Sequence, residues 1–169
     1  MAVMSGACVY TGQNYGARQY RRIRSGVNRV ILWSLLLTAG MVGLVWLFDR
    51  QIVAVFIKEG EKSAAAAVAR TYVRCITGGM LIMTPMYIIR ACVQTIGYSQ
   101  YPGIAGAFQL LARWFMAVVM PAFLGVTAFY LSDVAAWAVT LPIVSIPFYV
   151  ILGRLIREQE TCRADAPSA

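Results

Sequence analysis

Four apolar segments, each long enough to cross a lipid bilayer as a helix, constrain this chain more than any other feature of its sequence. They cover residues 27–48, 72–96, 104–129 and 134–152. The first contains about 22 residues and reaches about 33 Å as a helix, enough for a hydrocarbon core of about 30 Å. The sequence therefore predicts an all-α fold: a polytopic membrane helix bundle with four transmembrane helices.

The overall composition agrees with a membrane protein. Only 13% of the 169 residues are charged and 60% are apolar, whereas soluble domains carry about 25% charged residues. This composition argues against a soluble enzyme, a soluble binding module and a disordered chain. The net charge of +8 comes mostly from arginines beside the apolar segments, so we expect contact with the lipid bilayer and no binding of nucleic acid.

The distribution of basic residues predicts the orientation. Four arginines precede the first segment, a fifth (Arg29) lies at its entrance and three follow the fourth segment, whereas the connection between the first two segments carries Arg50, Lys58, Lys62 and Arg70. Basic residues concentrate on the cytoplasmic side of membrane proteins. We therefore expect both termini in the cytoplasm, with residues 1–26 forming the end of a preceding helix and a basic loop, and residues 154–169 forming a polar tail.

The sequence offers few groups for catalysis or metal binding. It has no histidine, and its four cysteines share no CxxC spacing, which predicts free thiols and no metal site. None of the seven acidic residues falls inside a predicted span. We expect no enzymatic activity and no cofactor.

Gln109 and Arg113 are the first candidates for contact with a substrate. They lie one helical turn apart inside the third segment, and a charge in the middle of a bilayer is costly unless it faces protein or water. The pair would line a polar cavity, or Arg113 would extend to the headgroups or pair with a helix backbone outside this chain.

Met83 and Met86 are further candidates, on the second segment. Flexible thioether side chains suit a pocket that accepts apolar compounds of varied shape. Simple packing between helices is the commoner use of such methionines.

The most specific stretch is GQNYGA at residues 12–17, followed by the basic YRRIRSG at 20–26. It resembles the cytoplasmic loop of MATE (multidrug and toxic compound extrusion) transporters, in which a GQNxGA-like motif precedes a short basic helix. Gly16 and Ala17 would allow a tight turn at the membrane edge, and the arginines would meet anionic headgroups. The residues that carry this resemblance are Gly12, Gln13, Asn14, Gly16 and Ala17.

A second stretch, RACVQTIG at residues 90–97, is similar to the R-x-x-x-Q-x-x-G pattern that ends the tenth helix of this family, through Arg90, Gln94 and Gly97. Residues 131–133 with the Ala-Trp pair at 136–137 resemble the turn into the last helix. The chain departs from the family at Tyr98, where many relatives have Asp, and at Gln109, where some have an acidic residue. These departures argue against a cation site in this part of the transporter.

The resemblance implies a function. The chain would run from the end of helix eight through helix twelve, part of the C-terminal lobe of a twelve-helix inverted-V transporter, as a fragment or as one piece of a split gene. Its partners would be the missing N-terminal lobe and small organic substrates. The whole would be an antiporter in the bacterial plasma (inner) membrane that exports cationic or amphipathic compounds by alternating access, and H+ or Na+ as the coupling ion is implied by the resemblance alone.

Two other functions are compatible with the sequence. A lipid-linked oligosaccharide flippase of a related fold would also use a basic cavity, to which Arg113 would contribute. A small membrane scaffold protein without transport activity would fit the four spans, although not the ordered series of motifs.

Overall fold

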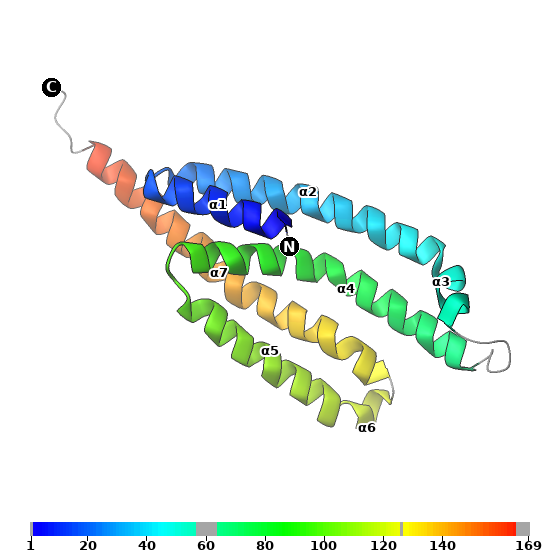
Figure 1. The fold of residues 1–169 in the computed structure, drawn as a ribbon. Helices are drawn as coiled ribbons and strands as arrows, with labels where there is room; N and C mark the ends of the chain where they lie inside the picture. Colours follow the sequence, from blue (N-terminus) through cyan, green and yellow to red (C-terminus); the bar gives the residue numbers. More distant parts are fainter. Residues whose placement is uncertain (1, 57–63, 126, 165–169) are drawn as a thin grey trace.

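The computed structural model describes residues 2–56, 64–125 and 127–164, and the elements in these ranges are helices (Figure 1). Their order is α1 (Ala2–Gly16), α2 (Tyr20–Leu47), α3 (Asp49–Phe56), α4 (Ala64–Thr95), α5 (Gln100–Val118), α6 (Pro121–Leu124) and α7 (Thr127–Ala164). The described ranges contain no strand. Four helical stretches, which include α2, α4, α5 and α7, are long and apolar enough to cross a membrane, so the predicted all-α polytopic bundle is confirmed.

The two middle helices of the bundle are α4 and α7, which pack against each other. Helix α2 packs on α4, α5 packs on α7, and α1 lies against both α2 and α4 (Figure 1). Large apolar side chains such as Leu32, Trp33 and Leu111 are exposed on the outer helices α2 and α5. Lipid or further protein can cover such a surface, because neither requires polar groups there.

The main buried cluster lies at one end of the bundle. It joins the middle of α1, the start of α2, the end of α4, the start of α5 and the middle of α7. Its members are Ala7, Ile23, Val27, Ile88, Ile89, Cys92, Val93, Ala105, Val144, Phe148 and Leu152. Because the arginines of α2 and of the last turns of α7 lie at the same end, we refer to it as the arginine-rich end and to the opposite one as the far end.

Glycines allow close approach of helices at two contacts. A Cβ atom on Gly79 of α4 would lie 2.6 Å from Val134 and 2.9 Å from Trp137 of α7. A Cβ atom on Gly26 of α2 would lie 2.2 Å from the Tyr10 ring of α1. Small residues commonly bring membrane helices together in this way, since lipid supplies no hydrophobic force between them.

Helices α1 and α4 end in the same hydrogen-bonding arrangement at the arginine-rich end. In α1 the amides of Gln19 and Arg18 donate to the carbonyls of Asn14 and Tyr15, at 2.8 and 3.0 Å. This is a Schellman motif, and the residue that adopts positive φ is Arg18, at 54°. Gly16, which the sequence suggested for the turn, remains helical.

In α4 the amides of Tyr98 and Gly97 donate to the carbonyls of Val93 and Gln94, at 3.2 and 3.1 Å. Here Gly97 takes the positive φ, at 91°. Glycine adopts this conformation without the steric cost that a Cβ atom imposes.

The connection between the third and fourth spans differs from the prediction. The sequence placed the turn at residues 131–133, but these residues lie inside α7. The chain turns earlier, after Val118 and through the short α6, where Pro121 begins the helix and Gly125 has φ of 57°. The turn consists of apolar residues, so the hydropathy pattern does not reveal it.

The two ends of the chain also differ from the predicted outline. The segment expected as a basic loop is only a short turn between α1 and α2, so Arg21, Arg22, Arg24 and Arg29 are helical. Helix α7 continues through Ala164 into the predicted polar tail. Residues 165–169, together with Lys58 and Lys62, lie outside the described residues.

We expect Gly97→Ala to lower the thermal unfolding midpoint of the purified protein, because a Cβ atom in a left-handed conformation costs about 1–2 kcal/mol. Arg18→Gly should raise the midpoint, since glycine removes that cost at the end of α1. The measurement is thermal unfolding in detergent.

The matched control is Gly103→Ala in α5, where a Cβ atom would meet nothing within 4 Å. This change should leave the midpoint unchanged or raise it slightly, since alanine favours helix. Equal midpoints for Gly97→Ala and Gly103→Ala would contradict the assignment.

Candidate functional site

The two motif stretches pack against each other at the arginine-rich end. Thr11 is fully buried, and its hydroxyl donates to the Cys92 sulfur at 3.4 Å. A Cβ atom on Gly12 would lie 3.3 Å from the Thr95 methyl group. The end of α1 therefore rests on the end of α4, and the two stretches form one contact although they are distant in the sequence.

Several other motif residues have no part in this contact. The Asn14 side chain donates to the Tyr10 carbonyl at 2.8 Å and thereby stays on its own helix. Gln13, Ala17 and Gln94 are exposed. The exposed side chains are free to meet groups outside the bundle, and the structure gives them no role within it.

Arg90 is the motif residue that reaches another helix. Its Nη1 donates to Gln109 Oε1 of α5 at 3.4 Å, a long hydrogen bond. The same guanidinium lies over Gly106, where a Cβ atom would stand 3.4 Å from Nη2. Arg90 therefore connects the last turns of α4 to α5, and it is the polar partner of Gln109.

Gln109 and Arg113 share a face of α5 but not a partner. Arg113 Nη2 lies 2.6 Å from Asp133 Oδ1 of α7. The side chains are half-exposed and one-third exposed, respectively. Arg113 therefore has a carboxylate partner within this chain, which the sequence analysis did not include among its alternatives.

Asp133 is the functional candidate that sequence analysis missed. The sequence suggested that no acidic residue lies in a span, but Asp133 is in the second turn of α7, within a stretch that is long and apolar enough to cross a membrane. The prediction placed the residue in a turn because the polar Ser-Asp pair interrupts an apolar run. The lone arginine of the third span was the available signal, since such a charge requires a partner.

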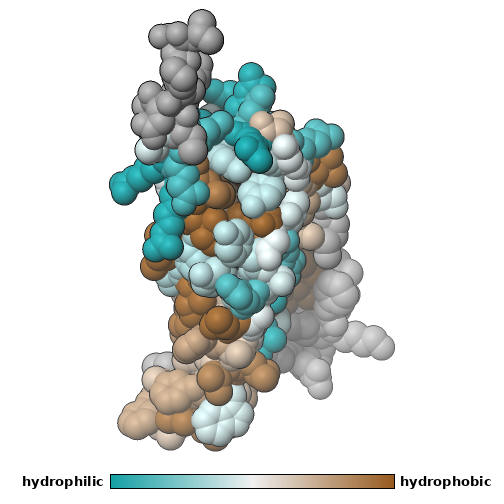
Figure 2. All heavy atoms as spheres, turned by 90° about the vertical axis from the view of Figure 1, so that its left-hand side faces the viewer, coloured by the Kyte–Doolittle hydropathy of each residue, from teal (hydrophilic) through white to brown (hydrophobic). Residues whose placement is uncertain are grey.

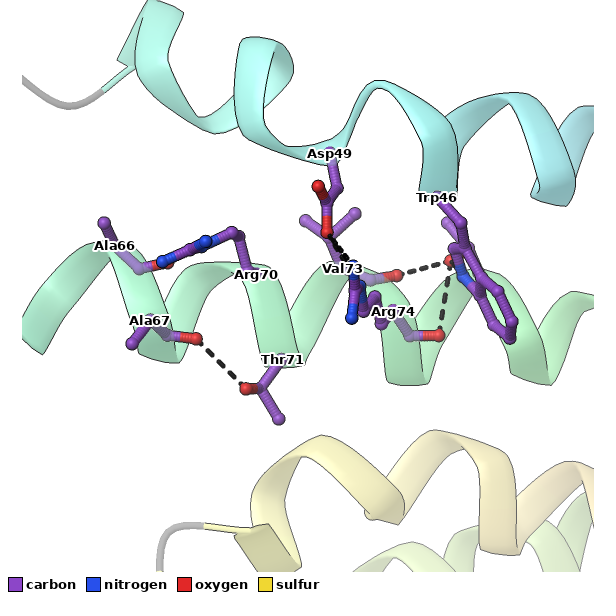
Figure 3. Close-up of polar contacts among 9 residues, drawn as sticks. Trp46, Asp49, Ala66, Ala67, Arg70, Thr71, Val73 and Arg74 are labelled. Atoms are coloured by element: carbon purple, nitrogen blue, oxygen red, sulfur yellow. Dashed lines mark hydrogen bonds and ion pairs between the residues drawn. The ribbon is translucent and has the colours of Figure 1, made fainter.

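A second ion pair lies between the start of α3 and α4, also toward the far end (Figure 3). Arg74 Nε donates to Asp49 Oδ2 at 2.7 Å, and its Nη2 is equally close to the same oxygen. Asp49 is 3% exposed. A carboxylate this buried requires its partner, because removal of the arginine would leave an uncompensated charge.

A hydrogen-bonded tryptophan lies beside this pair (Figure 3). The Trp46 indole donates to the Thr77 hydroxyl at 3.1 Å, and that hydroxyl donates to the Val73 carbonyl at 2.5 Å. Further along the same interface, the hydroxyls of Thr38 and Thr84 are 3.2 Å apart. The contact between α2 and α4 therefore carries polar interactions along much of its length.

The two methionine candidates lie in different environments. Met83 lines an apolar cavity of about 490 Å³ between α1, α2 and α4, with Met4, Leu37, Thr38 and Tyr87 among its neighbours. Met86 is fully buried and does not line this cavity. Gln109 and Arg113 do not line it either, so the four candidates do not form one site.

The described residues include no group of three or more His, Cys, Asp or Glu side chains that could hold a metal ion. Cys8, Cys75 and Cys92 are free thiols. Within the described ranges, the candidates Gln109 and Arg113 take part in arginine contacts with an amide and a carboxylate.

Comparison with known proteins identifies the family. The family model MatE matches residues 1–119, which include α1 to α5 and both motif stretches. No curated protein and no solved structure matches the chain. The match covers well over half of the sequence and agrees with the membrane-length helices, so the chain belongs to the MatE family of membrane transporters.

Proposed function

We propose that this chain forms one wall of the central cavity of an exporter that works by alternating access between two lobes. The exported compounds are cationic or amphipathic organic molecules, and the coupling ion is H+ or Na+. The observation that carries the proposal is the MatE match over residues 1–119. The second lobe is a partner outside this sequence.

The cavity beside Met83 supports an amphipathic substrate. Its volume of about 490 Å³ falls in the range of about 300–1,000 Å³ that is usual for small-molecule sites. Apolar side chains from three helices surround it, and the hydroxyls of Ser34, Thr38 and Thr84 add a few polar groups. Met83 can change rotamer to fit compounds of different shape.

The pair Arg113–Asp133 supports cation coupling. Transporters that use protons or sodium depend on carboxylates within their spans, and Asp133 supplies one. Its charge is matched by Arg113 at 2.6 Å, so protonation or cation binding at Asp133 would compete with this contact.

The charge distribution favours a topology in which the arginine-rich end and both termini face the cytoplasm. The membrane that we propose is the bacterial inner membrane. We expect cysteines placed at Gln51 and at Glu158, both exposed, to react with a membrane-impermeant maleimide from opposite sides of the membrane. The native cysteines are replaced first, and the labelling is done in intact and in permeabilised cells.

A cysteine at Ala17 serves as the control, since this exposed residue lies at the same end as Glu158. It should react with the maleimide from the same side of the membrane as Glu158→Cys. Labelling of Gln51→Cys and Glu158→Cys from one side would overturn the proposed topology.

We expect Met83→Trp, in the complete transporter that carries this sequence, to reduce export of bulky compounds more than export of small ones. The larger ring would occupy part of the cavity that Met83 lines. The measurement is efflux of a size series of fluorescent organic cations at matched protein abundance.

Met80→Trp is the matched control, because Met80 lies one turn earlier on α4 and is exposed. It should leave the size dependence unchanged. A uniform loss across the series in Met83→Trp would point to misfolding and would contradict a substrate-contacting cavity.

We expect Arg113→Gln and Asp133→Asn each to reduce export, because each leaves one unpaired partner in an apolar environment. The double variant should lose less than the sum of the two, with a coupling of about 0.5–3 kcal/mol between contacting residues. Arg113→Lys should retain most of the activity, since the ion pair uses a single close contact between Nη2 and Oδ1.

Efflux assays at matched abundance supply the measurement, and Arg154→Gln, an exposed arginine on the same helix as Asp133, supplies the control. Normal export by both single variants would remove this pair from the proposed mechanism. Strictly additive losses would show that the two residues act separately.

A further inference from the structure

A polar cavity of about 600 Å³ lies between α2 and α7 at the arginine-rich end. None of the candidate substrate residues lines it. The polar side chains around it come from two stretches, one in the first turns of α2 and one near the end of α7. They are Arg21, Arg24, Ser25, Asn28, Arg157 and Glu160.

The cavity has an excess of positive charge. Three arginines line it against one carboxylate, Glu160, and that carboxylate is already paired with Arg21. Among the residues that the structure describes, no carboxylate lies within ion-pair distance of Arg24 or Arg157. Two guanidinium groups therefore face the cavity without a carboxylate partner among the described residues.

Arg24 is held in place by an aromatic ring. Its guanidinium carbon lies 5.9 Å from the centre of the Tyr149 ring, within the range of a cation–π interaction. The Tyr149 hydroxyl in turn donates to Asn28 Oδ1 at 2.6 Å. This contact does not use up the five N–H donors of the guanidinium, which can still meet an acceptor such as the paired oxygens of a phosphate.

The cavity lies where the polar end of the bundle meets its apolar surface. Figure 2 views the arginine-rich end, where hydrophilic residues gather around the end of α7. On α2, Leu32 follows Asn28 after one turn and is 57% exposed; on α7, Ile146 and Val150 precede the lining residues on the same face and are exposed. A molecule with an anionic head and apolar chains matches this sequence of surfaces.

We propose that this cavity, the α2–α7 site, binds the phosphate of an anionic membrane phospholipid. Arg24 and Arg157 contact the phosphate oxygens, Ser25 and Asn28 contact the rest of the headgroup, and the acyl chains follow the apolar faces of α2 and α7. Basic pockets between membrane helices are suited to such headgroups. The site would hold a lipid of the surrounding membrane, and this binding does not depend on which compound the transporter exports.

The test compares lipid binding by two double variants of the full chain in detergent. Arg24→Gln with Arg157→Gln removes the two guanidinium charges, and both residues are exposed, so the buried cluster is not disturbed. Arg29→Gln with Arg154→Gln removes the same total charge from the same two helices, at exposed positions that do not line the cavity. Dioleoyl phosphatidylglycerol and dioleoyl phosphatidylcholine are titrated, and bound lipid is counted by native mass spectrometry.

The unchanged protein and the Arg29/Arg154 variant should prefer phosphatidylglycerol over phosphatidylcholine. The Arg24/Arg157 variant should lose about tenfold or more of its affinity for phosphatidylglycerol. Equal losses in the two double variants would reduce the effect to overall charge and overturn the site, as would the absence of any preference in the unchanged protein.

A further arm separates a lipid from a soluble phosphate. Glycerol 3-phosphate and inorganic phosphate are added as competitors at concentrations up to the millimolar range. Displacement of phosphatidylglycerol only by another anionic lipid supports the proposal. Displacement by glycerol 3-phosphate at the concentrations at which the lipid itself binds would show a site for a soluble phosphate, and the membrane phospholipid would be the wrong ligand.

Discussion

Charge inside an apolar bundle must find a partner, and this constraint organises the packing of the four membrane-length helices. An arginine within a bilayer is costly by several kcal/mol unless it meets protein, water or headgroups. Three arginines of this chain each meet an oxygen on a neighbouring element, and together they link α4 to α3, α4 to α5, and α5 to α7. The contacts are Arg74–Asp49, Arg90–Gln109 and Arg113–Asp133. Because lipid tails are as apolar as leucine, apolar side chains alone would determine only weakly which helix packs against which.

The main buried apolar cluster lies at the arginine-rich end, whereas the ion pairs of Asp49 and Asp133 lie toward the far end. At the arginine-rich end a continuous buried cluster fills the space between the helices, and the ends of α1 and α4 rest on each other through Thr11 and Cys92. Toward the far end, the ion pairs of Asp49 and Asp133 and the Trp46–Thr77 hydrogen bond join the helices. Ion pairs can exchange their partners when protons or ions arrive, whereas a packed apolar cluster cannot. Under the proposed alternating access, the ion-paired region would rearrange while the packed cluster stays intact.

Hydropathy was sufficient to predict the fold class and the presence of four membrane-length helices, because the length of an apolar run depends only on local sequence. The turn between the third and fourth helices was not predictable in this way, since Pro121 and Gly125 lie in an apolar stretch and the polar Asp133 lies within α7. The partner of Arg113 depended on that same error, because a helix that begins at Thr127 carries Asp133 inside the bundle. Met83 lines a cavity and Met86 is buried in the core, although both lie on α4. This difference depends on where the three neighbouring helices lie, and a single sequence does not specify their positions.

The location of the α2–α7 site follows from the same constraints. Arginines that cannot be paired inside the bundle must be placed where water or headgroups reach them, and the start of α2 and the end of α7 are such positions. Tyr149 joins the packed cluster to the surface: its ring packs against Phe148, which is fully buried, and its face lies under Arg24. The cation–π contact restrains the Arg24 guanidinium in part, which lowers the entropy that it loses when it binds a phosphate. The closely packed arginine-rich end of the bundle is therefore where a membrane lipid would be held in a defined orientation.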